Sequence, residues 1–101
     1  MASPLNRLIG MTLVSAGTDA EGLGLQFEGC SFAVYSRYES SADFAELVGL
    51  KVQSVDWSDE SLSIYFAGGF IRVWHRPSDY AGPEAFSARF ADGTWVIENG
   101  A

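Results

Sequence analysis

The sequence is poor in cysteine, histidine and basic residues. It has one cysteine and one histidine, and six basic residues stand against thirteen acidic ones, which gives a formal net charge of −7. A single cysteine cannot form an internal disulfide, so the fold does not need an oxidising compartment and a cytoplasmic location is expected. Nucleic acid is not an expected partner, because binding it relies on clustered Lys and Arg. No membrane partner is expected either.

Apolar and aromatic residues are plentiful. The chain of 101 residues is 48% hydrophobic and 14% aromatic, a composition that excludes disorder. A chain of this length is typical of one domain, so residues 1–101 are expected to fold around a single core. That core needs no metal or disulfide to hold it together.

The chain contains an internal repeat. Residues 8–37 align without a gap on residues 47–76 at an offset of 39, and nine of the 30 positions are identical. Residues 1–17 also carry a loose secretory-signal pattern, with an arginine, a short apolar run and small residues. Because this segment has a counterpart in the second copy, we assign it to the mature fold. Two copies are too few for a solenoid and favour a closed domain with pseudo-two-fold symmetry.

Each copy is predicted to be a three-stranded meander. Residues 23–27 and 32–34 alternate apolar and polar positions, as half-buried strands do. A primed two-residue turn at Gly29-Cys30 would pair Phe27 with Phe32, and one at Gly68-Gly69 would pair Phe66 with Ile71. A further strand is expected around residues 8–14 and 47–55, joined to the hairpins by acidic loops at 18–22 and 57–61.

A third hairpin is expected at residues 86–98. Asp92-Gly93 suits a type I′ turn, which would pair Phe90 with Trp95 and Ala88 with Ile97. Residues 40–47 and 83–85 are predicted to form short helical turns. The predicted fold is mainly β, or α+β with one or two short helices, in which the two meanders and the hairpin build a barrel or sandwich of about eight strands. The predicted core consists of Leu25, Phe27, Phe32, Val34, Ile64, Phe66, Ile71, Val73, Phe90 and Trp95.

The residues that carry catalytic chemistry do not form a recognisable set. His75 could act as a base, with Asp79 as its nearest acid, but a structural, half-buried histidine is favoured. Cys30 is expected to be an exposed thiol without a catalytic role. The acidic run at residues 56–60 could hold calcium but lacks EF-hand spacing. No catalytic, cofactor-binding or metal-binding residue is therefore assigned, no cofactor is expected, and an enzyme is disfavoured.

The two copies differ in one respect that bears on function. In the second copy, Tyr65, Phe70 and Trp74 stand where the first has Gln26, Ser31 and Tyr35. Arg72 replaces Ala33 and Trp57 replaces Thr18. The predicted register points these side chains away from the core, with Tyr65 opposite Arg72 and Ala67 opposite Phe70.

Aromatic residues and arginine are enriched at the centres of protein interfaces. The expected function is therefore an acidic protein-interaction module, homodimeric or bound to another protein. Its interface would consist of Trp57, Tyr65, Phe70, Arg72 and Trp74. A β-domain that binds a small apolar or aromatic ligand is the alternative, and coverage of this face by the chain itself also stays open.

Overall fold

The computed structural model describes residues 4–18, 22–76 and 85–98 of the chain. The described strands build two antiparallel sheets, and two short helical turns accompany them. In chain order the elements are η1 (Pro4–Leu8), β1 (Leu13–Thr18), β2 (Leu23–Phe27), β3 (Cys30–Val34), β4 (Tyr38–Ser40), α1 (Phe44–Leu47), β5 (Val52–Trp57), β6 (Ser61–Phe66), β7 (Gly69–Trp74), β8 (Phe86–Phe90) and β9 (Trp95–Glu98).

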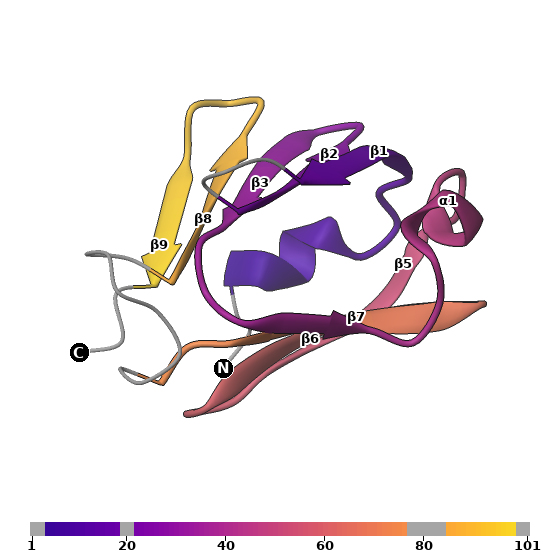
Figure 1. The fold of residues 1–101 in the computed structure, drawn as a ribbon. Helices are drawn as coiled ribbons and strands as arrows, with labels where there is room; N and C mark the ends of the chain where they lie inside the picture. Colours follow the sequence, from indigo (N-terminus) through magenta and orange to yellow (C-terminus); the bar gives the residue numbers. More distant parts are fainter. Residues whose placement is uncertain (1–3, 19–21, 77–84, 99–101) are drawn as a thin grey trace.

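The two sheets face one another across a shared core. One has the strand order β1-β2-β3-β8-β9 and the other β4-β7-β6-β5, and the 3₁₀ turn η1 lies between them (Figure 1). The mainly β prediction is confirmed, and of the two predicted forms the arrangement is sandwich-like and not a closed barrel. Leu5 and Leu8 of η1 are completely buried, so the apolar run near the start of the chain belongs to the core.

The predicted core is confirmed at nine of its ten positions. The nine side chains are at most 4% exposed, and they come from β2, β3, β6, β7 and β8. They are Leu25, Phe27, Phe32, Val34, Ile64, Phe66, Ile71, Val73 and Phe90. Trp95 is the exception, with 55% of its surface exposed.

The two copies meet in a backbone contact between equivalent residues. Thr12 forms an antiparallel bridge with Lys51, its own counterpart at the offset of 39. Around this bridge the hydrogen bonds come in matched pairs. Gly10 N donates to Val52 O and Gly49 N donates to Leu13 O, both over 2.8 Å. The crossing point therefore has the geometry of a local two-fold axis between the copies.

Glycine makes this crossing possible. Gly10 and Gly49 follow η1 and α1 respectively, with φ angles of 89° and 94°. Side chains other than glycine avoid this left-handed region, so the two glycines turn the chain out of each helical turn. Because these turns occupy residues that were predicted as strand, the first strand of each copy begins only at Leu13 or Val52. A β-bulge follows in each strand, between Leu13 and Ser15 and between the equivalent Val52 and Ser54.

After each meander the next strand crosses to the opposite sheet. β4 follows the first copy but pairs with β7 of the second, and β8 follows the second copy but pairs with β3 of the first. Each copy therefore completes the sheet of the other. The strand β4 was not predicted, because three residues of mixed polarity carry no periodic signal.

The two repeat hairpins differ from their predicted register by two residues. Phe27 pairs with Cys30 and Phe66 with Gly69, so the turns fall at residues 28–29 and 67–68. No residue in either turn has a positive φ, so the predicted primed turns are wrong. A slip of two residues keeps every side chain on its face, and for that reason the alternating pattern could not detect it.

The third hairpin differs from its predicted register by one residue. Phe90 N donates to Thr94 O over 2.8 Å, which leaves a three-residue loop at residues 91–93. Within it Gly93 N donates to Phe90 O over 2.9 Å, and Gly93 has a φ of 92°. This is a type I turn closed by a glycine bulge, one residue longer than the predicted type I′ turn. Arg89 consequently pairs with Trp95 and Ala88 with Val96. A shift of one residue exchanges the faces of a strand, so Val96 is buried while Trp95 and Ile97 are exposed.

The helical turns are shorter than expected. Of the predicted segment at residues 40–47, only Phe44–Leu47 is α-helical, and Ser40 belongs to β4. Ala85 lies in a bend, and residues 83–84 of the second predicted turn fall outside the described residues. Neither η1 nor α1 has the length to span a membrane, and the part of the chain that the structure describes contains no other helix.

We expect Phe66→Ala and Trp95→Ala to differ strongly in their effect on folding. Phe66 is 4% exposed, and its truncation should lower the free energy of unfolding by about 3–5 kcal/mol because a cavity remains. Trp95→Ala should cost less than about 1 kcal/mol, as for most surface substitutions. Urea denaturation of both variants measures the two values. Equal losses would contradict the register of β9.

Candidate interaction surface

The outer face of the second sheet presents alternate residues of β6 and β7. Leu62, Ile64 and Phe66 of β6 point into the core, whereas Tyr65 between them is partly exposed. On β7, Phe70, Arg72 and Trp74 are partly exposed and alternate with buried residues. Four of the five predicted interface residues thus lie on one outward face, where each is partly covered by the chain and partly exposed.

The observed register changes which of these residues are opposite one another. Tyr65 is paired with Phe70 rather than with Arg72, and their ring centroids are 6.0 Å apart with a 51° tilt. Arg72 is opposite Ser63, whose Oγ accepts a hydrogen bond from Arg72 Nε over 2.9 Å. The predicted pairs of Tyr65 with Arg72 and of Ala67 with Phe70 are therefore wrong. The patch still forms, because the slip of two residues preserves the face.

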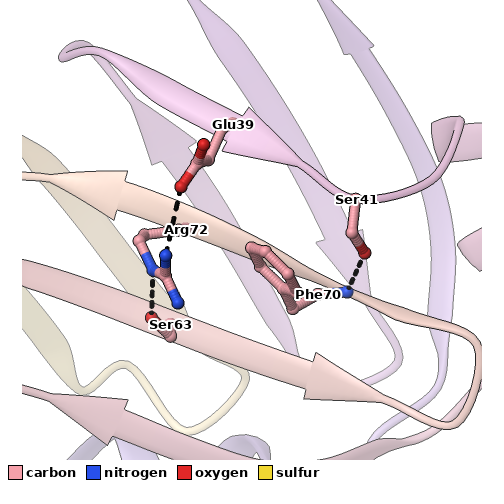
Figure 2. Close-up of polar contacts among 5 residues, drawn as sticks. All are labelled: Glu39, Ser41, Ser63, Phe70 and Arg72. Carbon is pink, nitrogen blue, oxygen red and sulfur yellow. Dashed lines mark hydrogen bonds and ion pairs between the residues drawn. The ribbon is translucent and has the colours of Figure 1, made fainter.

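Arg72 is held from two neighbouring strands. Besides the Ser63 contact, its NH1 group lies 3.2 Å from Oε1 of Glu39 on β4 (Figure 2). The Arg72 side chain remains 29% exposed, and an ion pair of this kind adds at most about 1 kcal/mol to stability. The two contacts hold the Arg72 guanidinium group in a defined position on this face.

Ser41 fixes the backbone of Phe70 in a similar way. Its Oγ accepts a hydrogen bond from Phe70 N over 2.8 Å, as Figure 2 shows. Ser41 N donates in turn to Phe70 O over 3.0 Å. Ser41, which follows β4 at the edge of the sheet, therefore holds both backbone groups of Phe70. The centroid of the Phe70 ring lies 4.8 Å from the Arg72 guanidinium carbon.

Three arginines surround Trp74. The guanidinium carbons of Arg37, Arg76 and Arg72 lie 4.9, 5.5 and 5.9 Å from its ring centroids, distances that suit cation–π contacts. Arg76 follows Trp74 by two residues, whereas its counterpart Arg37 is placed there by a backbone contact in which Trp74 N donates to Arg37 O over 2.9 Å. We call the set Tyr65, Phe70, Arg72, Trp74, Arg37 and Arg76 the aromatic–arginine face.

Trp57 does not belong to this face, which corrects the predicted interface. It pairs with the buried Leu62, and partners in antiparallel strands point to the same side. Its ring centroid lies 5.6 Å from that of Phe86 on the other sheet. The bulge between Val52 and Ser54 shifts the alternation of β5, and the sequence pattern carried no sign of that bulge.

His75 is a buried residue at the end of β7. It is 5% exposed, and its ring meets that of Phe86 edge-on at 6.3 Å. Nε2 lies 2.9 Å from the carbonyl oxygen of Ser58, so this nitrogen carries the proton that the carbonyl accepts. The contact ties the loop after β5 to the end of β7. Asp79, the acid weighed as its catalytic partner, lies outside the described residues.

Cys30 is buried, so the expected exposed thiol is wrong. It is the first residue of β3, not a turn residue, and is 3% exposed. Burial raises the pKa of the Cys30 thiol to about 11, despite a lowering effect of the Arg89 backbone and of Arg7. A thiol of this kind is a poor nucleophile at neutral pH.

Metal and small-molecule sites find little support in the described residues. Within residues 4–18, 22–76 and 85–98, His, Cys, Asp and Glu side chains do not form a group of three that could hold an ion. An open cleft of about 300 Å³ lies near the tips of the first and third hairpins. Its lining includes Gln26, Glu28, Ser31 and Arg89, which makes it polar, whereas ligand pockets are mostly apolar and enclosed.

Comparisons with protein-family models, with curated proteins and with solved structures found no match to this chain.

We expect the Cys30 thiol to react slowly in the folded protein. A rise of its pKa from 9.0 to about 11 lowers the thiolate fraction at pH 8 roughly 100-fold. Labelling with a disulfide reagent at pH 8 should therefore be at least about 100-fold slower in the folded than in the urea-unfolded protein. Because the unfolded chain loses this proton first, stability relative to Cys30→Ala should fall as pH rises from 9 towards 11. Rapid labelling of the folded protein would contradict the burial.

Proposed function

We propose that this chain is a protein-interaction module that docks through the aromatic–arginine face. The observation that supports the proposal most directly is the environment of Trp74, a partly exposed indole contacted by three arginines on a rigid sheet. Tryptophan, tyrosine and arginine are the residues most enriched among interface hot spots. Because Arg72 and Phe70 are already held in place, a partner would have to order few side chains on binding.

The charges of this face favour a partner that presents acidic groups. Three of the six basic residues of the chain contact Trp74, although the protein as a whole carries a charge of −7. A guanidinium group has five N–H donors, so an arginine that already has a partner keeps donors for a carboxylate. We therefore propose a partner segment in which carboxylates surround an apolar or aromatic side chain that covers Trp74.

A second copy of this chain fits the face less well. A two-fold contact centred on Trp74 would bring Arg37, Arg72 and Arg76 against the same arginines of the partner copy. Like charges in a desolvated contact are unfavourable, so we place a different protein here. The lone, buried thiol of Cys30 suits a reducing compartment, and we propose a cytoplasmic location for the interaction.

Replacing Trp74 with glutamate should abolish docking and leave the fold intact. The matched control is Tyr35→Glu, which makes the same change at the equivalent position of the first copy, where Tyr35 is 39% exposed. Peptides selected from a random displayed library on the wild type should be rich in acidic residues. We expect Trp74→Glu to weaken their binding at least 30-fold, corresponding to about 2 kcal/mol, and Tyr35→Glu to leave it unchanged.

The salt dependence of binding provides a second measurement. Contacts between carboxylates and partly exposed arginines weaken as ionic strength rises, so affinity for the selected peptides should fall between low and physiological salt. Selected peptides that bind Trp74→Glu as well as they bind the wild type would contradict the proposal. A wild-type dimer that Trp74→Glu alone dissociates would instead assign the face to self-association.

A further inference from the structure

The edge strand β9 is the least protected edge of the two sheets. Sheet edges are normally guarded by bulges, charges or short length, because their unpaired N–H and C=O groups can bind another strand. β1 and β5 each carry a bulge, and β4 is three residues long with Glu39 at its centre. β9 is four residues long; its pairing with β8 is regular, and Trp, Val and Ile precede its one charged residue, the terminal Glu98.

The hydrogen bonds of β8 determine which β9 groups point outward. Ala91 N donates to Gly29 O and Tyr35 N donates to Ala85 O, so the odd-numbered residues of β8 bond towards β3. Phe90 N donates to Thr94 O, so the even-numbered residues bond towards β9. Backbone direction alternates along an antiparallel strand. Val96 therefore bonds to β8, while the N–H and C=O groups of Trp95 and Ile97 point to the open edge.

The side chains of the same two residues are exposed. Trp95 is 55% and Ile97 53% exposed, and both extend from the outer face of the sheet. The Arg89 guanidinium carbon lies 5.4 Å from the Trp95 ring, which restrains the indole on this face. In the part of the chain that the structure describes, no strand pairs with the outer edge of β9.

We propose that β9 pairs with β9 of a second copy, in antiparallel orientation, to form a two-fold dimer with a continuous sheet across both chains. With the axis at Val96, Trp95 of one chain is opposite Ile97 of the other, and the reverse pair forms by symmetry. These two residues carry the outward backbone groups, so the two pairs form four hydrogen bonds. The same register produces two aromatic–β-branched side-chain pairs, which are favourable neighbours in sheets.

A second copy fits this edge better than an unrelated strand does. Residues 93–97 contain no charged side chain, so two negatively charged molecules can meet here without placing like charges in contact. The remaining repulsion acts between net charges of −7 and is screened by salt. The paired segment is short, so we expect a weak, concentration-dependent dimer. This proposal is independent of the aromatic–arginine face, which lies on the other sheet.

Sedimentation equilibrium of four proteins tests the dimer. The wild type, of 10.9 kDa, should double its mass with rising concentration, and more readily at high salt. Ile97→Lys should raise the dissociation constant at least about tenfold, because it removes the apolar pair with Trp95 and places on the edge a charge of the kind that opposes strand pairing. The matched control is Val14→Lys, the same charge change at a 51% exposed residue on the opposite edge of the same sheet. Val14→Lys and Trp74→Glu should dimerise like the wild type.

Amide hydrogen exchange of the wild type tests the register without any substitution. The amides of Trp95 and Ile97 should become protected as concentration rises, whereas the Val96 amide is bonded to β8 and should be protected at every concentration. A wild type that stays monomeric up to about 1 mM would overturn the proposal. So would a dimer that Ile97→Lys leaves intact, or one that forms without new protection at Trp95 and Ile97.

Discussion

The whole arrangement depends on the backbone crossing at Thr12 and Lys51. This bridge joins equivalent residues of the two copies, and matched hydrogen bonds from Gly10 and Gly49 flank it. Because each residue at this contact pairs with the other copy, the contact fixes the position and direction of each copy relative to the other. The two sheets consequently face each other, and η1 of the first copy contacts β5 of the second while α1 contacts β1. The crossing strands β4 and β8 then close each sheet with a strand from the other copy.

A shared backbone leaves the outer faces free to differ. The core positions of the two copies carry similar residues because both faces of the core must be filled, as with Phe27 and Phe66. Outward positions are not restricted in this way, and Ser31 and Phe70 occupy the same place in the two hairpins. The first sheet therefore exposes small and polar side chains over β2 and β3, while the second exposes aromatic rings and arginine. The duplication accounts for the shared backbone. The differences at outward positions account for the aromatic and basic character of the outer face of the second sheet.

The two surfaces proposed for contact differ in physical character. The aromatic–arginine face is built from side chains, and its arginines suit carboxylates. The β9 edge offers the main-chain groups and the apolar side chains of Trp95 and Ile97. Salt affects the two in opposite directions, because it weakens attraction between opposite charges and relieves repulsion between like net charges. The two surfaces lie on different sheets, so the two proposals do not depend on one another.

The sequence by itself determined the repeat, the face of nearly every core residue and the outward position of Tyr65, Phe70, Arg72 and Trp74. Each of these depends on alternation along a strand, which is a local property. Tertiary structure decided the pairing of strands, where a slip of two residues leaves the pattern unchanged. Tertiary structure also decided on which side of its sheet two tryptophans lie, because one extra residue reverses the alternation along a strand. The bulge in β5 turns Trp57 inward, and the longer loop at Gly93 turns Trp95 outward. The pairing of β4 with β7 and the contact of Arg37 with Trp74 join residues distant in the chain, and no local pattern encodes such contacts. The position of β9 at the end of its sheet likewise follows from the strand order.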